Sequence, residues 1–425
     1  MSAKDSNKSR STAQFDAEID AHLMYVGQIE GPLGAPTARF RYPHYFSSSG
    51  AHFNSRGAMV RQGRAEINPF HYRFPRFVKG SALLGTGVGW LSMKDLTLQP
   101  VTLEELRPSI GVLGRDGGFA SVSFPRKGVS ASDEAADVTI DVHDFRGAHR
   151  MSMSTRIGFW LDGVLPSPGM LAYDEPHARL VIASRVVEDE GTSAGGITCV
   201  NVKTGSVLWQ QPVSAGQVEV SRDGSKLLVL THSGIAIVNM KTGQLMSRVR
   251  ECDHGGALFP PYNTRWMGDR VVAWHPDSKF IVMGGPEESG VLAIQLRETR
   301  TWRALWEYQV ENPQYESPAT SDESCVSPNR YIREISVSRC GKLVAFVAGD
   351  LYLVDGGTGA LIQRVPARDN VRTWEGVHFS DDSHSMALAS HEILLVYDIQ
   401  RARNQASGTP NAANWLSRLT KFWVD

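Results

Sequence analysis

The sequence lacks the signals of a secreted or membrane-spanning protein. Among 425 residues there are only four cysteines, which form neither a CxxC pair nor a dense disulfide framework. No stretch reaches the ~18 apolar residues of a transmembrane helix. Residues 1–20 are polar and contain no apolar core of a secretory signal. Because sparse cysteines are typical of a reducing compartment, we predict a cytoplasmic protein.

Motifs for catalysis and ligand binding are also missing. The chain contains no HExxH zinc motif, no Walker loop, no GxSxG elbow and no zinc-spaced set of cysteines and histidines. The glycines at 85, 87 and 89 have the spacing GxGxG, and a strand-like pattern follows them where a dinucleotide site needs a helix. We therefore predict no catalytic residue, no cofactor and no metal site. The net charge of −1 provides no overall attraction to nucleic acid.

What the chain does contain is a repeated pattern of short strands. The stretch Val218–Arg250, VEVSRDGSKLLVLTHSGIAIVNMKTGQLMSRVR, reads as three or four strands separated by turn signals. Asp223-Gly224 and Thr242-Gly243 mark two of these turns, because glycine accepts the positive φ that tight turns require. Strands this short cannot bury their apolar residues alone, so the unit needs neighbours of the same kind.

Copies of this unit occur along the chain. The Thr-Gly turn recurs at 204–205 and 358–359. Successive copies are 43 to 63 residues apart when measured between the residues that begin the inner strands, namely Phe119, Leu180, Leu227, Phe280, Leu343 and Met386. This spacing brackets the ~40–50 residues of a four-stranded propeller blade. We predict an all-β fold consisting of a single β-propeller with seven four-stranded blades, with six or eight blades as alternatives.

These turns carry a resemblance to a known superfamily. The Asp223-Gly224 turn with its degenerate copies, and the Thr-Gly turns at 204–205, 242–243 and 358–359, resemble the repeats of WD40 and quinoprotein-like (YVTN-type) propellers. The segment from Thr204 to Trp209 is similar to one repeat of a pyrroloquinoline-quinone dehydrogenase. The resemblance covers about residues 110–400 and implies a fold, which by itself does not imply a function.

The domain boundaries follow from composition. We predict a disordered tail at 1–20, the propeller at 21–400, a linker at 401–410 and a short amphipathic helix at 411–425. Residues 22–29 look like a strand that completes the last blade and so closes the ring. In the C-terminal segment, Trp415, Leu419 and Phe422 share one face of a helix. That face contacts either the flank of the propeller or a partner.

Residues 39–79, which we call the basic–aromatic segment, differ from the rest of the chain. The segment contains eight Arg or Lys residues, nine aromatic residues and one acid, Glu66. The partner-binding candidates in it are Arg39, Arg41, Tyr42, Tyr45, Arg56, Arg61, Arg64, Tyr72 and Arg73. In the alternative interpretation the aromatic residues belong to the core and the arginines are solvated or paired with acids elsewhere.

The sequence thus favours a non-catalytic scaffold that binds another protein, and effector- or toxin-neutralising proteins of bacteria are one class of this kind. A protein partner fits better than nucleic acid, because Arg and Tyr are the usual residues of interface hot spots. The alternative is an enzyme with its active site in the central channel of a quinoprotein-like propeller. Residues 251–264 and 309–329 are predicted to be long loops on one rim, which also favours binding there. The pattern does not indicate an oligomeric state.

Overall fold

The computed structural model describes residues 31–41 and most of residues 76–406. Within the second range the described residues are interrupted at 78–82, 87–88, 93–97, 101–108, 115–117, 124–134, 145–148, 159–170, 184–194, 214, 216, 232–233, 251–270, 287–290, 311–331, 368–373, 375 and 391–392. All statements about the structure concern these residues.

The described residues form seven antiparallel sheets of four strands each. Along the chain the first three sheets contain β2 (Arg76–Phe77), β3 (Leu83–Thr86), β4 (Gly89–Ser92) and β5 (Leu98–Pro100); β6 (Ser109–Leu113), β7 (Phe119–Ser123), β8 (Ala135–His143) and β9 (His149–Gly158); and β10 (Leu171–Asp174), β11 (Arg179–Ala183), β12 (Ile197–Asn201) and β13 (Val207–Gln211). A short 3-10 helix, Glu175–His177, joins β10 to β11.

The next three sheets contain β14 (Gln217–Val220), β15 (Lys226–Thr231), β16 (Gly234–Asn239) and β17 (Leu245–Arg250); β18 (Val271–Trp274), β19 (Phe280–Pro286), β20 (Leu292–Glu298) and β21 (Ala304–Gln309); and β22 (Glu334–Val337), β23 (Leu343–Ala348), β24 (Asp350–Asp355) and β25 (Leu361–Val365). The last sheet combines β26 (Gly376–Phe379), β27 (Ser385–Ala389) and β28 (Ile393–Asp398) with β1 (Ala38–Arg41) from the other end of the chain.

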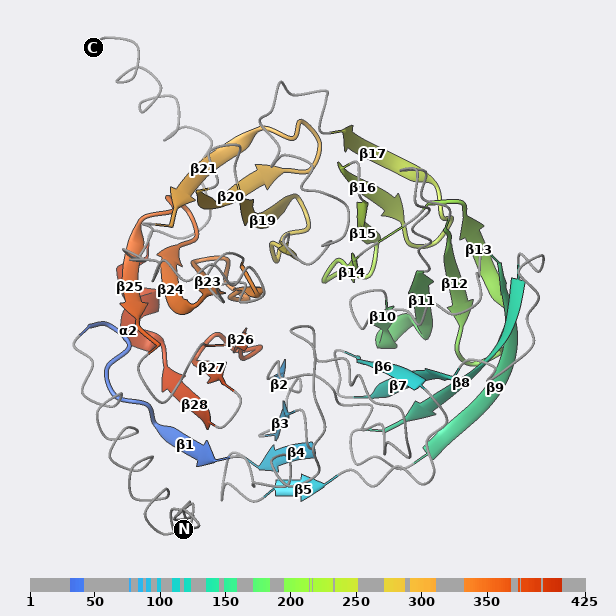
Figure 1. Ribbon diagram of the computed structural model, residues 1–425, viewed down its shortest axis with the longest axis horizontal. Helices are drawn as coiled ribbons and strands as arrows, with labels where there is room; N and C mark the ends of the chain where they lie inside the picture. The colour runs from blue at the N-terminus through green and yellow to red at the C-terminus, as the bar shows by residue number, and fades with distance from the viewer. Residues whose placement is uncertain are drawn as a thin grey trace, which may run out of the picture.

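The seven sheets stand as blades around a central axis (Figure 1). The first strand of each blade lies at the centre and the fourth at the circumference. Contacts between neighbouring innermost strands run from β6 through β10, β14, β18 and β22 to β26, which in turn contacts β2. The chain is therefore a single all-β propeller, as predicted from the repeats.

The repeat markers located the strands closely. Phe119, Phe280 and Leu343 begin β7, β19 and β23. The other three markers lie one residue inside β11, β15 and β27. The stretch from Val218 to Arg250 lies in the blade β14–β17, with turns at Asp223-Gly224 and Thr242-Gly243 as predicted. Turn chemistry and apolar runs were sufficient for this part of the fold.

The core lies between the blades. All six residues of β23 and five of the six residues of β24 are buried. A strand that is buried on both faces reads as a continuous apolar run, because each blade is covered by a neighbour on either side. On the fourth strands the pattern changes to a mixture of exposed and buried residues, as in β13 and β25. The contacts between blades are thus buried, and the circumference is partly exposed.

A repeated contact joins the outer parts of neighbouring blades. Trp209 on β13 donates a hydrogen bond from Nε1 to the carbonyl oxygen of Met240 in the next blade, at 3.0 Å. Its ring lies on Gly243, where a Cβ atom would stand 2.7 Å from the indole and where φ is +72°. Trp306 makes the equivalent bond to the carbonyl of Gly356, at 2.8 Å. The glycine of the Thr-Gly turn is therefore required both by its backbone conformation and by the tryptophan.

The ring is closed by a strand from the N-terminal part of the chain, but the predicted residues were wrong. We predicted 22–29, which lie outside the described residues, whereas β1 is Ala38–Arg41. β1 pairs antiparallel with β28, and Thr37 donates its backbone N–H to the carbonyl of Val396 at 2.7 Å. A strand at the circumference needs no apolar run, so the sequence Ala-Arg-Phe-Arg gave little signal.

A short helix stands where a linker was predicted. Helix α2 (Gln400–Gln405) follows β28 directly and buries Ala402. Arg403 anchors the helix by donating from Nη1 to the carbonyl of Ser383 at 3.1 Å. Leu33, which precedes β1, belongs to the same apolar cluster as Ala402. Chain segments from both ends therefore meet at the closure of the ring, while the predicted helix at 411–425 lies outside the described residues.

Removing the tryptophan contact should loosen two blades at once. We expect Trp209→Ala to reduce the free energy of unfolding by about 3–5 kcal/mol, because a buried indole and its hydrogen bond are lost. Leu208→Ala, next to it but 43% exposed, should change stability by less than ~0.5 kcal/mol. Chemical denaturation of both variants measures the difference, and equal effects would contradict the inter-blade role of Trp209.

Truncation tests the closure. Deleting residues 1–41 removes β1 and leaves β28 with an open edge, so the melting temperature should fall and aggregation should increase. Deleting residues 1–30 keeps the strand and serves as the matched control. If both truncated proteins melt at the same temperature as the full chain, β1 does not close the ring.

Candidate functional site

The two faces of the propeller differ in the length of their connections. Short turns join the first strand to the second and the third to the fourth, and antiparallel pairing places all of these turns on one face, which we call the short-turn face. Connections between the second and third strands and between blades belong to the opposite face. They range from one residue between β23 and β24 to more than twenty between β21 and β22, and we call this side the long-connection face. The basic–aromatic segment leaves β1 at Arg41 and returns at Arg76 of β2, and both positions lie at the long-connection face.

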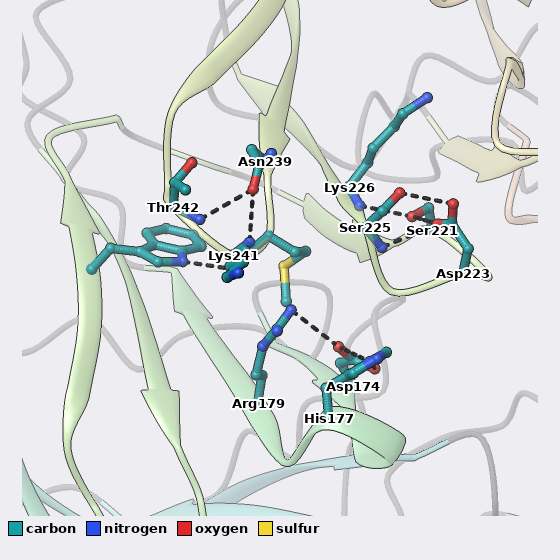
Figure 2. Close-up of polar contacts among 12 residues, drawn as sticks. Asp174, His177, Arg179, Ser221, Asp223, Ser225, Lys226, Asn239, Lys241 and Thr242 are labelled. Carbon is teal, nitrogen blue, oxygen red and sulfur yellow. Dashed lines mark hydrogen bonds and ion pairs between the residues drawn. The ribbon is translucent and has the colours of Figure 1, made fainter.

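Two turns between first and second strands share one hydrogen-bond arrangement, shown for Ser221–Lys226 in Figure 2. The Asp223 carboxylate accepts hydrogen bonds from the Ser221 hydroxyl at 2.6 Å and from the Ser225 N–H and hydroxyl at 3.1 and 2.8 Å. The Ser221 oxygen accepts the N–H of Lys226 at 2.9 Å. Asp382 with Ser380 repeats this arrangement in the last blade. Side chains of the turn thus form hydrogen bonds with its own backbone N–H groups and hold the turn rigid.

The carboxyl groups of these turns have lowered pKa values. Partial burial alone would raise the pKa of Asp223, but hydrogen bonds from Ser221 and Ser225 outweigh that effect and lower it below 3.8. Asp382 behaves in the same way, with burial opposed by hydrogen bonds from the Ser380 hydroxyl and the His384 N–H, and its pKa is also lowered. The charged form of each carboxyl is therefore the one that the fold stabilises.

Neighbouring turns pack against each other. In Figure 2 the Asp174 carboxylate lies beside the His177 ring, with 3.0 Å between the oxygen and Nδ1. Gly224 of the next blade rests on this pair, and a Cβ there would stand 2.7 Å from His177 Nδ1. On the other side of the turn, Lys226 donates from Nζ to the carbonyl of Ser278 at 2.7 Å. Each innermost turn is thus fixed by the turns beside it.

One ion pair joins blades that are not neighbours. Arg222 donates from Nη2 to Asp381 Oδ1 at 2.5 Å, although the blades β18–β21 and β22–β25 lie between these residues in the ring. Arg339 approaches the other carboxylate oxygen of Asp381 at 3.6 Å. The innermost turns therefore meet across the central opening of the short-turn face. Since the pair is about a quarter exposed, we assign it a bridging role and little stabilisation.

Most partner-binding candidates lie outside the described residues. Arg39 and Arg41 are placed on β1, where only their backbone is described. Outside the described residues are Tyr42, Tyr45, Arg56, Arg61, Arg64, Tyr72, Arg73, Trp415, Leu419 and Phe422, together with the predicted loops at 251–264 and most of 309–329. Their roles stay predictions, although the strand ends that flank the loops lie on the long-connection face.

Two features escaped sequence analysis. An open groove lies between residues 32–34 and helix α2 and is lined in part by Leu33, Arg401 and Asn404. Apolar side chains at the start of the outer strands are also exposed, among them Leu245 and Met246. The repeated Thr-Gly turns marked where these strands begin, but the exposure of the residues after them depends on the outer position of the strand.

No site for metal chemistry is present in the described part of the chain. Within these ranges, no three side chains of His, Cys, Asp or Glu cluster so that they could hold a metal ion. Cys199 is buried, and burial raises the pKa of its thiol to about 12. The described helices include none that is long and apolar enough to cross a membrane.

Comparison with known proteins agrees with the fold. No protein-family model and no curated protein matches the sequence. A chain of the mitotic checkpoint complex aligns over 87% of this chain and 96% of its own length, with a TM-score of 0.51 and 11% identity. A chain of Kuenenia stuttgartiensis hydrazine synthase aligns over 83% and 99%, with a TM-score of 0.50 and 12% identity. These proteins contain propellers, and at such identities the likeness shows the fold alone.

The lowered pKa values of these carboxyls predict how stability depends on pH. In the unfolded chain the carboxyls of Asp223 and Asp382 titrate near 3.8 and in the folded chain below it. Their contribution is therefore complete above about pH 4 and is lost as the pH falls through the lower folded-state values. The double variant Asp223→Asn, Asp382→Asn should melt below the parent at pH 7, and the difference should shrink toward about pH 2.

Asp137→Asn is the control, because this residue is exposed on β8. It should melt as the parent does at both pH values. A difference between the parent and the double variant that stays constant from neutral to acid pH would show that the turn carboxylates are not responsible.

Proposed function

We propose that the protein is a non-catalytic scaffold that binds a protein partner on its long-connection face. The observation that carries this proposal is that residues 42–75 of the basic–aromatic segment are joined to the propeller at Arg41 and Arg76, which both lie at that face. The ends of the strands that flank 251–270 and 311–331 lie there as well. Segments joined to a rigid scaffold at both ends are favoured places for recognition.

The opposite face supports this assignment. Its turns are held by local hydrogen bonds and by contacts from blade to blade, and Arg222 and Asp381 bridge its central opening. A face built in this way serves as a stiff base. A stiff scaffold restricts the connections on the other face before binding. Less conformational entropy is therefore lost when these connections become ordered on a partner.

Charge indicates what kind of partner would bind. Eight basic residues against one acid give the basic–aromatic segment a charge of +7, so the remainder of a chain with net charge −1 carries −8. This asymmetry favours a partner with an acidic face. The interleaved aromatic residues, Tyr42, Tyr45 and Tyr72 among them, would provide desolvated anchors at the centre of the interface.

The C-terminal segment is a second element of the proposal. The described chain ends at Ala406, after the helix that forms one wall of the groove. Trp415, Leu419 and Phe422 follow within twenty residues and would contact either this flank of the propeller or the partner. A cytoplasmic location agrees with the small number of cysteines. Effector- or toxin-neutralising proteins are one class in which such a scaffold would act.

The test combines partner capture with charge reversal. The full chain is immobilised, partners are captured from native lysate and identified by mass spectrometry, and each is then produced for direct binding. The triple variant Arg56→Glu, Arg61→Glu, Arg64→Glu should bind the partner at least tenfold more weakly and with less dependence on salt, because the attraction to acidic residues is removed. Its melting temperature should equal that of the parent.

A matched triple variant on the short-turn face, Lys279→Glu, Arg300→Glu, Lys342→Glu, changes the net charge equally and should bind like the parent. If both triple variants bind equally, the basic–aromatic segment is a solvated surface and the proposed interface is wrong. If the first variant melts at a lower temperature, its arginines pair within the fold.

A further inference from the structure

The circumference of two neighbouring blades exposes apolar side chains in equivalent positions. Val207 and Leu208 on β13 are 39% and 43% exposed, and Leu245 and Met246 on β17 are 54% and 53% exposed. Each pair begins the outermost strand of its blade, directly after a Thr-Gly turn. Single exposed apolar residues are ordinary on protein surfaces, but two adjacent pairs in register need an explanation.

The two pairs belong to one continuous surface. Trp209, which follows Leu208, contacts Gly243, two residues before Leu245, so the two strand beginnings are neighbours in space. On the other side, a Cβ atom at Gly205 would stand 3.6 Å from Met153 of β9. Figure 1 shows β9, β13 and β17 following one another along the same part of the circumference. We call this surface, from Met153 to Met246, the blade-edge patch.

The outermost strands of the patch carry only basic charges, although the exposed Asp137 of β8 pairs in register with Arg156 of β9. The strands β9, β13 and β17 contain no aspartate or glutamate. Exposed cations surround the apolar pairs, with Lys203 and Lys241 in the turns before β13 and β17 and Arg156 and Arg248 on β9 and β17. The next blade differs, because Glu298 and Glu307 accompany its outer strand β21. The cationic and apolar character is therefore interrupted at β21, although β25 also begins with an exposed apolar residue, Leu361, at 46%.

The backbone at the patch can accept a further strand. β13 and β17 are each the last strand of their sheet among the described residues. A terminal strand has N–H and C=O groups directed outward, and an extended peptide can pair with them while its side chains contact the alternate residues of the edge.

We propose that the blade-edge patch binds an extended segment of a partner protein that is rich in acidic and apolar residues. Carboxylates of the segment would face Lys203 and Lys241, and its apolar side chains would cover Leu208 and Met246. A protein segment fits better than a lipid surface, because it alone supplies backbone groups for the sheet edge. A second copy of this chain fits poorly, because a symmetric contact would bring cations against cations.

This inference rests on the proposed scaffold function but uses a different surface from the basic–aromatic segment. The proposed scaffold interface and the proposed blade-edge patch can therefore be refuted independently. The triple variant Arg56→Glu, Arg61→Glu, Arg64→Glu leaves the patch unchanged and should retain all binding that the patch provides.

The experiment measures which peptide sequences bind to the blade-edge patch. A random library of displayed peptides is selected on the immobilised full chain, and the enriched peptides are synthesised and measured by fluorescence anisotropy. We expect enrichment of Asp or Glu together with Val, Ile, Leu or Phe. Binding should weaken at least tenfold in Lys203→Glu, Lys241→Glu and separately in Leu208→Ser, Met246→Ser. These side chains are exposed, so both variants should melt like the parent.

The double variant Lys279→Glu, Arg300→Glu is the control and should bind the peptides as the parent does. Enriched peptides without acidic residues, or peptides that bind both patch variants unchanged, would overturn the proposal. Two other results that depend on the patch residues would also overturn it. Binding to phosphatidylserine vesicles without peptide enrichment would assign the surface to membranes. A dimer that both patch variants dissociate would assign it to a second copy of the chain.

Discussion

The whole structure depends on one constraint, that a four-stranded blade has two apolar faces and can cover them only with other blades. Strands such as β23 and β24 are buried on both sides for this reason. A row of blades leaves two uncovered faces at its ends, and only a closed ring removes both. The inter-blade contacts of Trp209 and Trp306 and the interlocked innermost turns are the means by which neighbours are held in place.

The sequence predicted the fold wherever strands and turns leave a local signature. Apolar runs and Asp-Gly or Thr-Gly turns located the inner strands of most blades to within one residue. They failed for β1, because Ala38–Arg41 lies at the circumference and lacks an apolar run. They also failed for α2, whose Ala402 is buried in a cluster that includes Leu33 from the distant N-terminal part. Tertiary position, which a single sequence does not contain, decided both.

The candidate sites were less predictable than the fold. Composition alone pointed to the basic–aromatic segment, and the structure adds where its ends are held. The pair Arg222–Asp381 joins residues 159 positions apart, and no periodic signal connects them. The exposure of Leu245 and Met246 could not be read from the sequence either, because the same residue types are buried on inner strands such as β15. Whether an apolar pair is core or surface depends on its distance from the axis.

The closure by β1 also determines the order of events during synthesis. Thr37 and its partner Val396 are separated by 359 positions, so the segment that completes the last blade leaves the ribosome long before the strand with which it pairs. Until then every nascent chain carries an open ring, with uncovered blade faces at both ends. Long-range pairing of this kind slows folding and exposes intermediates to aggregation. Chains interrupted before the last blade should therefore be prominent clients of chaperones and proteases.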